Sequence, residues 1–191
     1  MEIRYPLELT QKRRKNICTS RSFGVGTTEL LKLKEAVGSY ANNCATKLRY
    51  QKSCCTNVSV FLSTNPFKPQ AKQYHPYRVF NLDVPTNDSI EIVKTALIAL
   101  ESIFKNGYRY QKAGVLLSGL SEATNNKNLF SSEKDEKINS LMKSIDNTNY
   151  RYGRSTLSLA SAGVHKRWNM KREYSSKIDT ADFHCLPTIK T

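Results

Sequence analysis

Residues 87–107 constrain the fold most, because their apolar side chains recur at helical spacing more regularly than those elsewhere in the chain. Asn87 or Asp88 can cap the first turn, and Glu91 stands three residues after Asp88 as in a capping box. The stripe that follows consists of Ile90, Val93, Leu97, Leu100 and Phe104. A helix with one apolar stripe must bury it, so the rest of the chain has to supply a matching surface.

A second helix and four strands can supply that surface. Thr27 or Thr28 can cap a helix with the apolar stripe Leu30, Leu33, Val37, Ala41, Cys44 and Leu48. Strand patterns cover residues 16–24, 57–64, 77–83 and 108–117. This order of elements predicts an α+β domain, with a four-stranded, mainly antiparallel sheet backed by two helices on one face. We expect the other face of the sheet to be free and to carry the function.

A change of composition near residue 118 divides the chain. Residues 113–117 are apolar and should be buried, whereas residues 118–127 are polar and include Gly119, Asn125 and Asn126. This polar stretch predicts a linker, which ends in the apolar pair Leu129-Phe130. The sequence therefore predicts a domain at 1–120, a linker at 121–132 and a small domain at 133–191.

The charge of the chain points to an anionic partner. Its 191 residues carry a formal net charge of +14, with a sequence pI near 9.6. Nucleic acid is the commonest partner of such a surface, followed by the membrane. No apolar run approaches the roughly 18 residues of a spanning helix, and charge follows Met1, so we expect a cytoplasmic protein. An odd number of cysteines without a CxxC pair predicts free thiols.

Two segments carry a resemblance to a known family. Residues 19–24 read TSRSFG, and residues 108–115 read YRYQKAGV. At this separation the pair resembles the little-finger domain of Y-family translesion DNA polymerases, and most closely those of the UmuC type. Further along, Asn128-Leu129-Phe130 resembles the sliding-clamp-binding peptide of that family. Residues 152–154, 168–172 and 186–187 resemble the small C-terminal domain of UmuC-type polymerases.

The resemblance implies a part of a polymerase without its chemistry. In that family the palm carboxylates that hold two Mg²⁺ ions lie upstream of the little finger. The 16 acidic residues of this chain include no pair in an apolar strand that could replace them. We therefore expect a non-catalytic C-terminal part with no cofactor of its own. The implied partners are double-stranded primer–template DNA, the sliding clamp, a UmuD-type subunit and RecA.

The DNA-binding residues implied by the resemblance are Arg21, Ser22, Phe23, Gly24, Arg109 and Lys112. Residues 21–24 are interpreted as a turn in which main-chain N–H groups, a hydroxyl and a cation hold a phosphate oxygen. Without the resemblance, a strand end with a solvated arginine would be favoured. Regular alternation places Arg109 and Lys112 on opposite faces, so only one faces outward unless a bulge re-aims the other. For Tyr108 and Tyr110 we expect packing and no contact with DNA.

The clamp-binding residues implied by the resemblance are Asn126, Asn128, Leu129 and Phe130. The two apolar side chains would fill a pocket on the clamp as anchors of an extended peptide. Asn126 stands where the family motif usually opens with Gln, which predicts weaker binding. The alternative is that Leu129 and Phe130 fold back on their own domain.

Two questions stay open at the level of sequence. Residues 166–172 place Trp168 and Met170 between basic pairs, which fits either a binding helix or the core of a small domain. For the whole chain we expect a DNA-binding and clamp-tethering part of an error-prone SOS translesion polymerase. A basic RNA-binding protein or a protein adaptor is the alternative.

Overall fold

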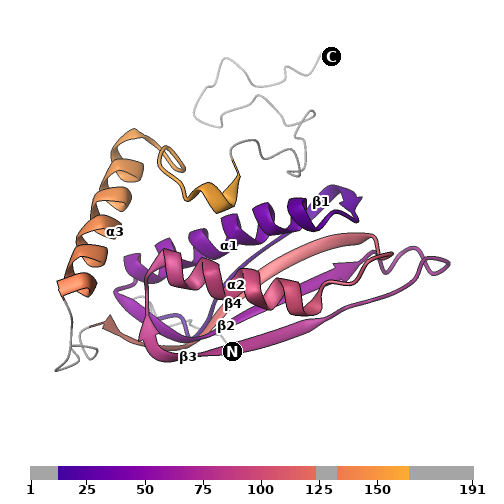
Figure 1. The fold of residues 1–191 in the computed structure, drawn as a ribbon, viewed down its shortest axis with the longest axis horizontal. Helices are drawn as coiled ribbons and strands as arrows, with labels where there is room; N and C mark the ends of the chain where they lie inside the picture. The colour runs from indigo at the N-terminus through magenta and orange to yellow at the C-terminus, as the bar shows by residue number, and fades with distance from the viewer. Residues whose placement is uncertain (1–12, 124–132, 164–191) are drawn as a thin grey trace, which may run out of the picture.

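The computed structural model describes residues 13–123 and 133–163, and its elements follow the predicted order (Figure 1). They are β1 (Ile17–Thr27), α1 (Leu30–Tyr50), β2 (Ser53–Thr64), β3 (Tyr77–Thr86), α2 (Ser89–Ile103), β4 (Tyr110–Glu122), α3 (Glu133–Tyr152) and η2 (Ala160–Ala162). The four strands form one antiparallel sheet in the order β1-β4-β2-β3. Helices α1 and α2 cover one face of it (Figure 1). The α+β prediction is confirmed.

The core lies between the two helices and the sheet. On α1 the predicted stripe is buried, from Leu33 to Leu48, with Leu30 packed at its margin. On α2 the prediction was partly wrong, because Ile90 is 45% exposed and Leu97 is only partly buried. The buried face of α2 instead contains two alanines among larger residues: Ile92, Val93, Ala96, Ala99, Leu100 and Ile103. Alanine side chains allow α2 to pack closely, but a search of the sequence for large apolar residues at helical spacing does not find them.

The two helix starts differ from the predictions in detail. Asp88 caps α2, and its carboxylate accepts from the Ile90 backbone N–H at 2.9 Å. The N–H of Asp88, which a capping box would assign to Glu91, donates to Thr86 Oγ1 at 3.2 Å instead. Helix α1 begins after Glu29 rather than after Thr27 or Thr28, because β1 runs as far as Thr27.

Strand β4 continues to Glu122, which is five residues into the polar stretch 118–127 and two residues into the predicted linker 121–132. Ser53, Cys54 and Cys55 of β2 pair with Glu122, Ser121 and Leu120 of β4. Gly119 has a φ of +64°, and a Cβ there would lie 2.0 Å from Thr56 Oγ1. Residues 118–122 are therefore the polar end of a strand. Their main chain pairs with β2, and position 119 requires glycine.

The segment 133–163 lies against the helical layer (Figure 1). Ala162 of η2 is buried, and a Cβ at Gly38 of α1 would lie 2.8 Å from the Ser161 carbonyl oxygen. On α3, Met142 is buried and Asp146 pairs with Arg49 at the end of α1. The remaining residues of the predicted small domain, 164–191, lie outside the described part.

Among the described residues, no helix is long and apolar enough to span a bilayer. Cys18, Cys44, Cys54 and Cys55 are free thiols, as predicted, and Cys18 is the exposed member of these four.

Candidate nucleic-acid interface

The face of the sheet opposite the helices is lined mainly by small and hydroxyl side chains. Val58, Val60 and Leu62 of β2 point to the core, so the alternate residues of each strand point away from it. We call these residues the free face: Cys18, Ser20, Ser22, Asn57, Ser59, Phe61, Ser63, Tyr77, Val79, Asn81, Lys112, Gly114, Leu116 and Ser118. Lys112 is its only charged member.

Two aromatic residues lie flat on the free face. A Cβ at Gly114 would lie 2.2 Å from Phe61 Cζ and 2.6 Å from Ser20 Cβ, so the Phe61 ring occupies the space that a side chain of β4 would take. The Tyr77 hydroxyl donates to Ser59 Oγ at 3.0 Å, which holds this ring along the sheet as well. The middle of the free face is therefore smooth, without long side chains standing out from it.

The prediction that residues 21–24 form a turn is wrong, because these residues lie within β1. Ser22 is opposite Lys112 and belongs to the free face. Arg21 is opposite the buried Ala113 and therefore extends from the helical side of the sheet edge. There it lies near Tyr40, whose pKa burial raises to about 12, while the positive charge of Arg21 opposes that rise.

Phe23 and Gly24 have different roles from each other. The Phe23 side chain is 2% exposed and belongs to the core, so only its main chain can reach a ligand. Its carbonyl oxygen accepts from Gln111 Nε2 at 2.6 Å. Gly24 is exposed on the edge strand. Of residues 21–24, Ser22 is thus the one whose side chain lies on the free face.

A bulge in β4 interrupts the alternation near its start. Ser63 pairs with Lys112 but Thr64 pairs with Tyr110, so Gln111 is an extra residue. Lys112 faces outward between Ser22 and Ser63 through the regular alternation with Ala113, and the bulge turns Tyr110 into the core, where it is fully buried. Arg109 lies just before the strand, where its Nε donates to the Gly26 carbonyl oxygen at 3.0 Å.

Ser63 and His75 complete the polar group around Lys112. Ser63 Oγ lies 2.8 Å from His75 Nδ1, and Ser63 is the cross-strand neighbour of Lys112. Sequence reasoning missed both residues as site candidates. The alternation of residues 57–64 was a signal for Ser63, since it placed the serine opposite the apolar stripe. Nothing in the sequence indicated His75.

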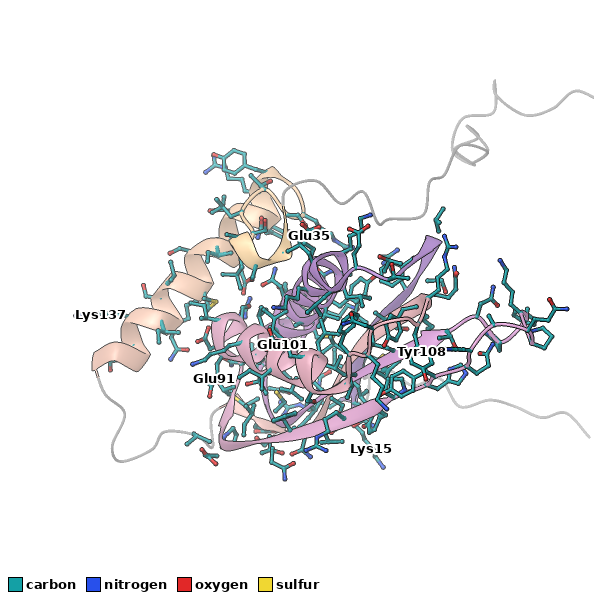
Figure 2. All side chains as sticks on the ribbon, turned by 45° about the vertical axis from the view of Figure 1, so that its right-hand side comes forward. Lys15, Glu35, Glu91, Glu101, Tyr108 and Lys137 are labelled. Carbon is teal, nitrogen blue, oxygen red and sulfur yellow. The ribbon has the colours of Figure 1, made fainter. Side chains whose placement is uncertain are left out.

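Exposed cations gather at the end of the sheet where β2 ends and β3 and β4 begin. This cationic end comprises Arg21, Lys68, Lys72, Arg78, Arg109 and Lys112. Two acids of the neighbouring helical side are already paired, Glu29 with Lys32 at 2.7 Å and Glu101 with Lys34 at 2.5 Å. Figure 2 shows Glu101 on α2, on the helical layer. Of its members on strands, Lys112 carries its charge on the free face, whereas Arg21, opposite Ala113, and Arg78, opposite Val60, extend from the helical side of the sheet.

The predicted clamp-binding residues Asn126, Asn128, Leu129 and Phe130 lie outside the described residues, as do Trp168 and Met170. Within the described residues, no group of three or more His, Cys, Asp or Glu side chains is arranged to hold a metal ion.

Comparison with known families identifies the chain. The model of the impB/mucB/samB family C-terminal domain matches residues 14–129. The chain belongs to this family. The prediction of a UmuC-type C-terminal part is thereby confirmed. A second model, described only as a domain of unknown function, matches residues 139–189.

Two curated relatives are longer than this chain, and the matches show which share of their length it covers. It is 35% identical over 179 residues to Protein UmuC of Salmonella typhimurium (strain LT2), covering 93% of this chain and 42% of that protein. It is 34% identical over 186 residues to Protein ImpB of Salmonella typhimurium, covering 95% of this chain and 43% of that protein. The chain thus spans less than half the length of these curated relatives.

A solved structure described as the insertion ternary complex of Dbh DNA polymerase is a more distant match to this family member. The TM-score is 0.43 and the sequence identity 9%, over 56% of this chain and 29% of that one. At this level of similarity the match carries no conclusion about function.

Proposed function

We propose that residues 13–123 bind the backbone of primer–template DNA, as the little-finger part of an error-prone translesion DNA polymerase. The observation that carries the proposal is the position of Lys112, which projects from a smooth sheet face between two serine hydroxyls. Membership of the impB/mucB/samB family supports the polymerase context.

The chemistry of the free face suits phosphate contacts. A lysine beside Ser22 offers one ionic contact and one hydroxyl donor, which are common partners of phosphate oxygens, whereas the Ser63 hydroxyl donates to the Thr64 carbonyl oxygen at 3.0 Å. The guanidinium groups of the cationic end add attraction that depends on charge alone. The side chains of the free face that could read base edges are the short amides of Asn57 and Asn81, which lie at the end of the sheet away from Lys112. Binding should therefore be nearly independent of DNA sequence, which suits an enzyme that must tolerate damaged bases.

Salt dependence tests the DNA contact. In fluorescence anisotropy on a labelled primer–template, affinity should fall steeply with salt and should be equal for a scrambled sequence. Lys112→Ala should reduce the slope of log K against log salt by about 1, because one phosphate is no longer neutralised. Lys143→Ala, which removes an exposed lysine from α3, serves as the matched control and should leave the slope unchanged.

Three outcomes would count against the proposal. Absence of binding at low salt would exclude a DNA role for this chain. An unchanged slope for Lys112→Ala would exclude the free face as the contact. Tighter binding to single-stranded RNA than to the primer–template would favour the RNA-binding alternative.

We further propose that residues 126–130 tether the chain to the sliding clamp. The tether would raise the effective concentration of the DNA-binding part at the primer end. Leu129→Ala combined with Phe130→Ala should abolish binding to the clamp and leave binding to DNA intact. Equal loss of both activities would mean that these side chains stabilise the fold instead. We also propose contacts with a UmuD-type subunit and with RecA. These two partners are proposed from the family membership and not from particular residues of this chain.

A further inference from the structure

The loop that joins β2 to β3 presents an aromatic ring to solvent. Residues 65–76 extend beyond the sheet at the end where β2 stops (Figure 1). Within this loop the side chain of Phe67 is 90% exposed. By contrast, Tyr74 packs at the base of the loop, with its ring 4.9 Å from that of Tyr108 and its hydroxyl donating to the Ile103 carbonyl oxygen at 3.1 Å. The loop is thus anchored at its base and bears an uncovered ring further out.

The loop is held in one conformation by its own polar groups. The Gln73 amide nitrogen lies 3.0, 2.9 and 3.2 Å from the carbonyl oxygens of Asn65, Lys68 and Ala71. The Gln73 amide oxygen accepts from Thr64 Oγ1 at 2.8 Å. The Phe67 N–H donates to Asn65 Oδ1 at 3.0 Å. Pro66, Pro69 and Pro76 restrict the backbone further. The exposed ring is therefore carried by an ordered scaffold, which lowers the entropy lost when a ligand binds.

The surroundings of the ring are cationic. Lys68 and Lys72 are exposed in the same loop, and residues 65–76 contain no acidic residue. The loop follows directly after Ser63 and Thr64, and Ser63 is the neighbour of Lys112 on the free face. An exposed aromatic ring with cations in the same loop is an arrangement that proteins use for unpaired bases, with the ring stacking on a base and the cations contacting phosphates.

We propose that the 65–76 loop binds single-stranded DNA where it adjoins the duplex held on the free face. Phe67 stacks on an unpaired base, and Lys68 and Lys72 contact the phosphates on either side of it. This inference rests on the proposed function, since it extends the same DNA-binding surface. A partner protein would use Phe67 as an apolar anchor, but Lys68 and Lys72, in a loop without acidic residues, favour a polyanion.

The test compares the affinities of the 191-residue chain for two DNA probes. One probe is a blunt duplex, and the other is the same duplex with a single-stranded 5′ overhang, each followed by anisotropy. Phe67→Ala should weaken binding to the overhang probe by roughly 5- to 150-fold, the loss expected for one base–aromatic stack, and should leave the blunt duplex unaffected. Phe67→Leu should lose as much, because it keeps an apolar side chain but cannot stack.

Two further variants separate charge from stacking and test specificity. Lys68→Ala combined with Lys72→Ala should lower the salt slope on the overhang probe by about 0.7 for each phosphate that a lysine no longer neutralises. Tyr150→Ala is the matched control, because Tyr150 is 93% exposed but lies on α3, away from the cationic end. It should leave binding to both probes unchanged.

Each failure has a distinct pattern. Normal binding of both probes by Phe67→Ala overturns the inference and leaves the proposed function standing. Equal weakening on both probes shows that the loop contacts duplex DNA without a preference for unpaired bases, which also overturns it. Retention of binding by Phe67→Leu shows an apolar contact in place of stacking and overturns the stacking role of the ring. Failure of the unsubstituted chain to bind either probe overturns the proposed function and this inference together.

Discussion

Removal of the Asp146 carboxylate should detach α3 from the helical layer. Arg49 Nε lies 2.6 Å from Asp146 Oδ2, and Arg49 Nη2 lies 2.8 Å from Asp146 Oδ1, so the ion pair is bidentate. The Arg49 side chain is 11% exposed and that of Asp146 is 28% exposed. Arg49 Nη1 also donates to the Asn87 carbonyl oxygen at 2.9 Å and to Ser89 Oγ at 2.8 Å. One guanidinium therefore joins the end of α1, the start of α2 and the middle of α3.

The expected energies follow from this geometry. A hydrogen bond to a charged group contributes about 1.5–3 kcal/mol, but solvent screens the partly exposed Asp146, so we expect a coupling energy of about 1–2 kcal/mol. Asp146→Ala should lower the free energy of unfolding by a similar amount, about 1–2 kcal/mol. Arg49→Ala should cost more, about 2–4 kcal/mol, because it also leaves the Asn87 carbonyl and the buried Ser89 hydroxyl without this donor.

A double-mutant cycle measures the coupling directly. Urea denaturation of the unsubstituted chain, both single variants and the double variant gives the four free energies of unfolding. Lys143→Ala, on the same helix but exposed, should stay within about 0.5 kcal/mol of the unsubstituted chain. A coupling energy below about 0.3 kcal/mol would refute the reasoning, because it is no larger than the coupling of distant, independent sites.

Two other perturbations test the packing of the sheet. Gly114→Ala should destabilise the fold by about 1–3 kcal/mol, because its Cβ would lie 2.2 Å from Phe61 Cζ; Phe61→Ala in the same chain should restore part of the loss in urea denaturation, and no recovery would contradict the contact. Burial raises the pKa of Cys44 from 9.0 to about 11 and that of Cys55 from 9.0 to about 12. Above pH 9 the folded state therefore keeps thiol protons that the unfolded state loses. The contribution of the two thiols to the free energy of unfolding is complete below pH 9 and is lost as the pH rises toward about 11 to 12. The loss is at most ~1.4 kcal/mol per pH unit for each thiol. Urea midpoints at pH 8 and pH 10 should differ less in the chain with Cys44→Ala and Cys55→Ala; an unchanged difference would exclude the thiols as its cause.

The sequence predicted the element order well because hydrophobic periodicity depends on which face each element buries. The α1 stripe and the alternation of Val58, Val60 and Leu62 both report burial directly, and the structure confirms them. Features that depend on backbone pairing were less accessible. The extension of β4 to Glu122 comes from main-chain bonds with β2, which a polar composition does not reveal.

Only part of the candidate site was predicted, because it too depends on backbone pairing. A single extra residue, Gln111, reverses the alternation at the start of β4, so Tyr110 is buried although Lys112, two positions further on, faces outward. Sequence reasoning allowed for such a bulge but could not locate it. The interpretation of residues 21–24 as a turn was wrong because glycine and serine also occur within edge strands. His75 reaches Ser63 only because the loop brings them together, which no local pattern indicates.

The strand order also sets a constraint on how the protein emerges from the ribosome. Strand β4 lies between β1 and β2, although it is the last of the four strands in the sequence. Within the described part, β4 is the only strand that pairs with β1, and about ninety residues of chain separate the paired positions. The β2–β3 hairpin can form before β4 is made, whereas the edge of β1 stays unpaired until β4 has left the exit tunnel. During that interval the unpaired edge of β1 is open to pairing with another chain.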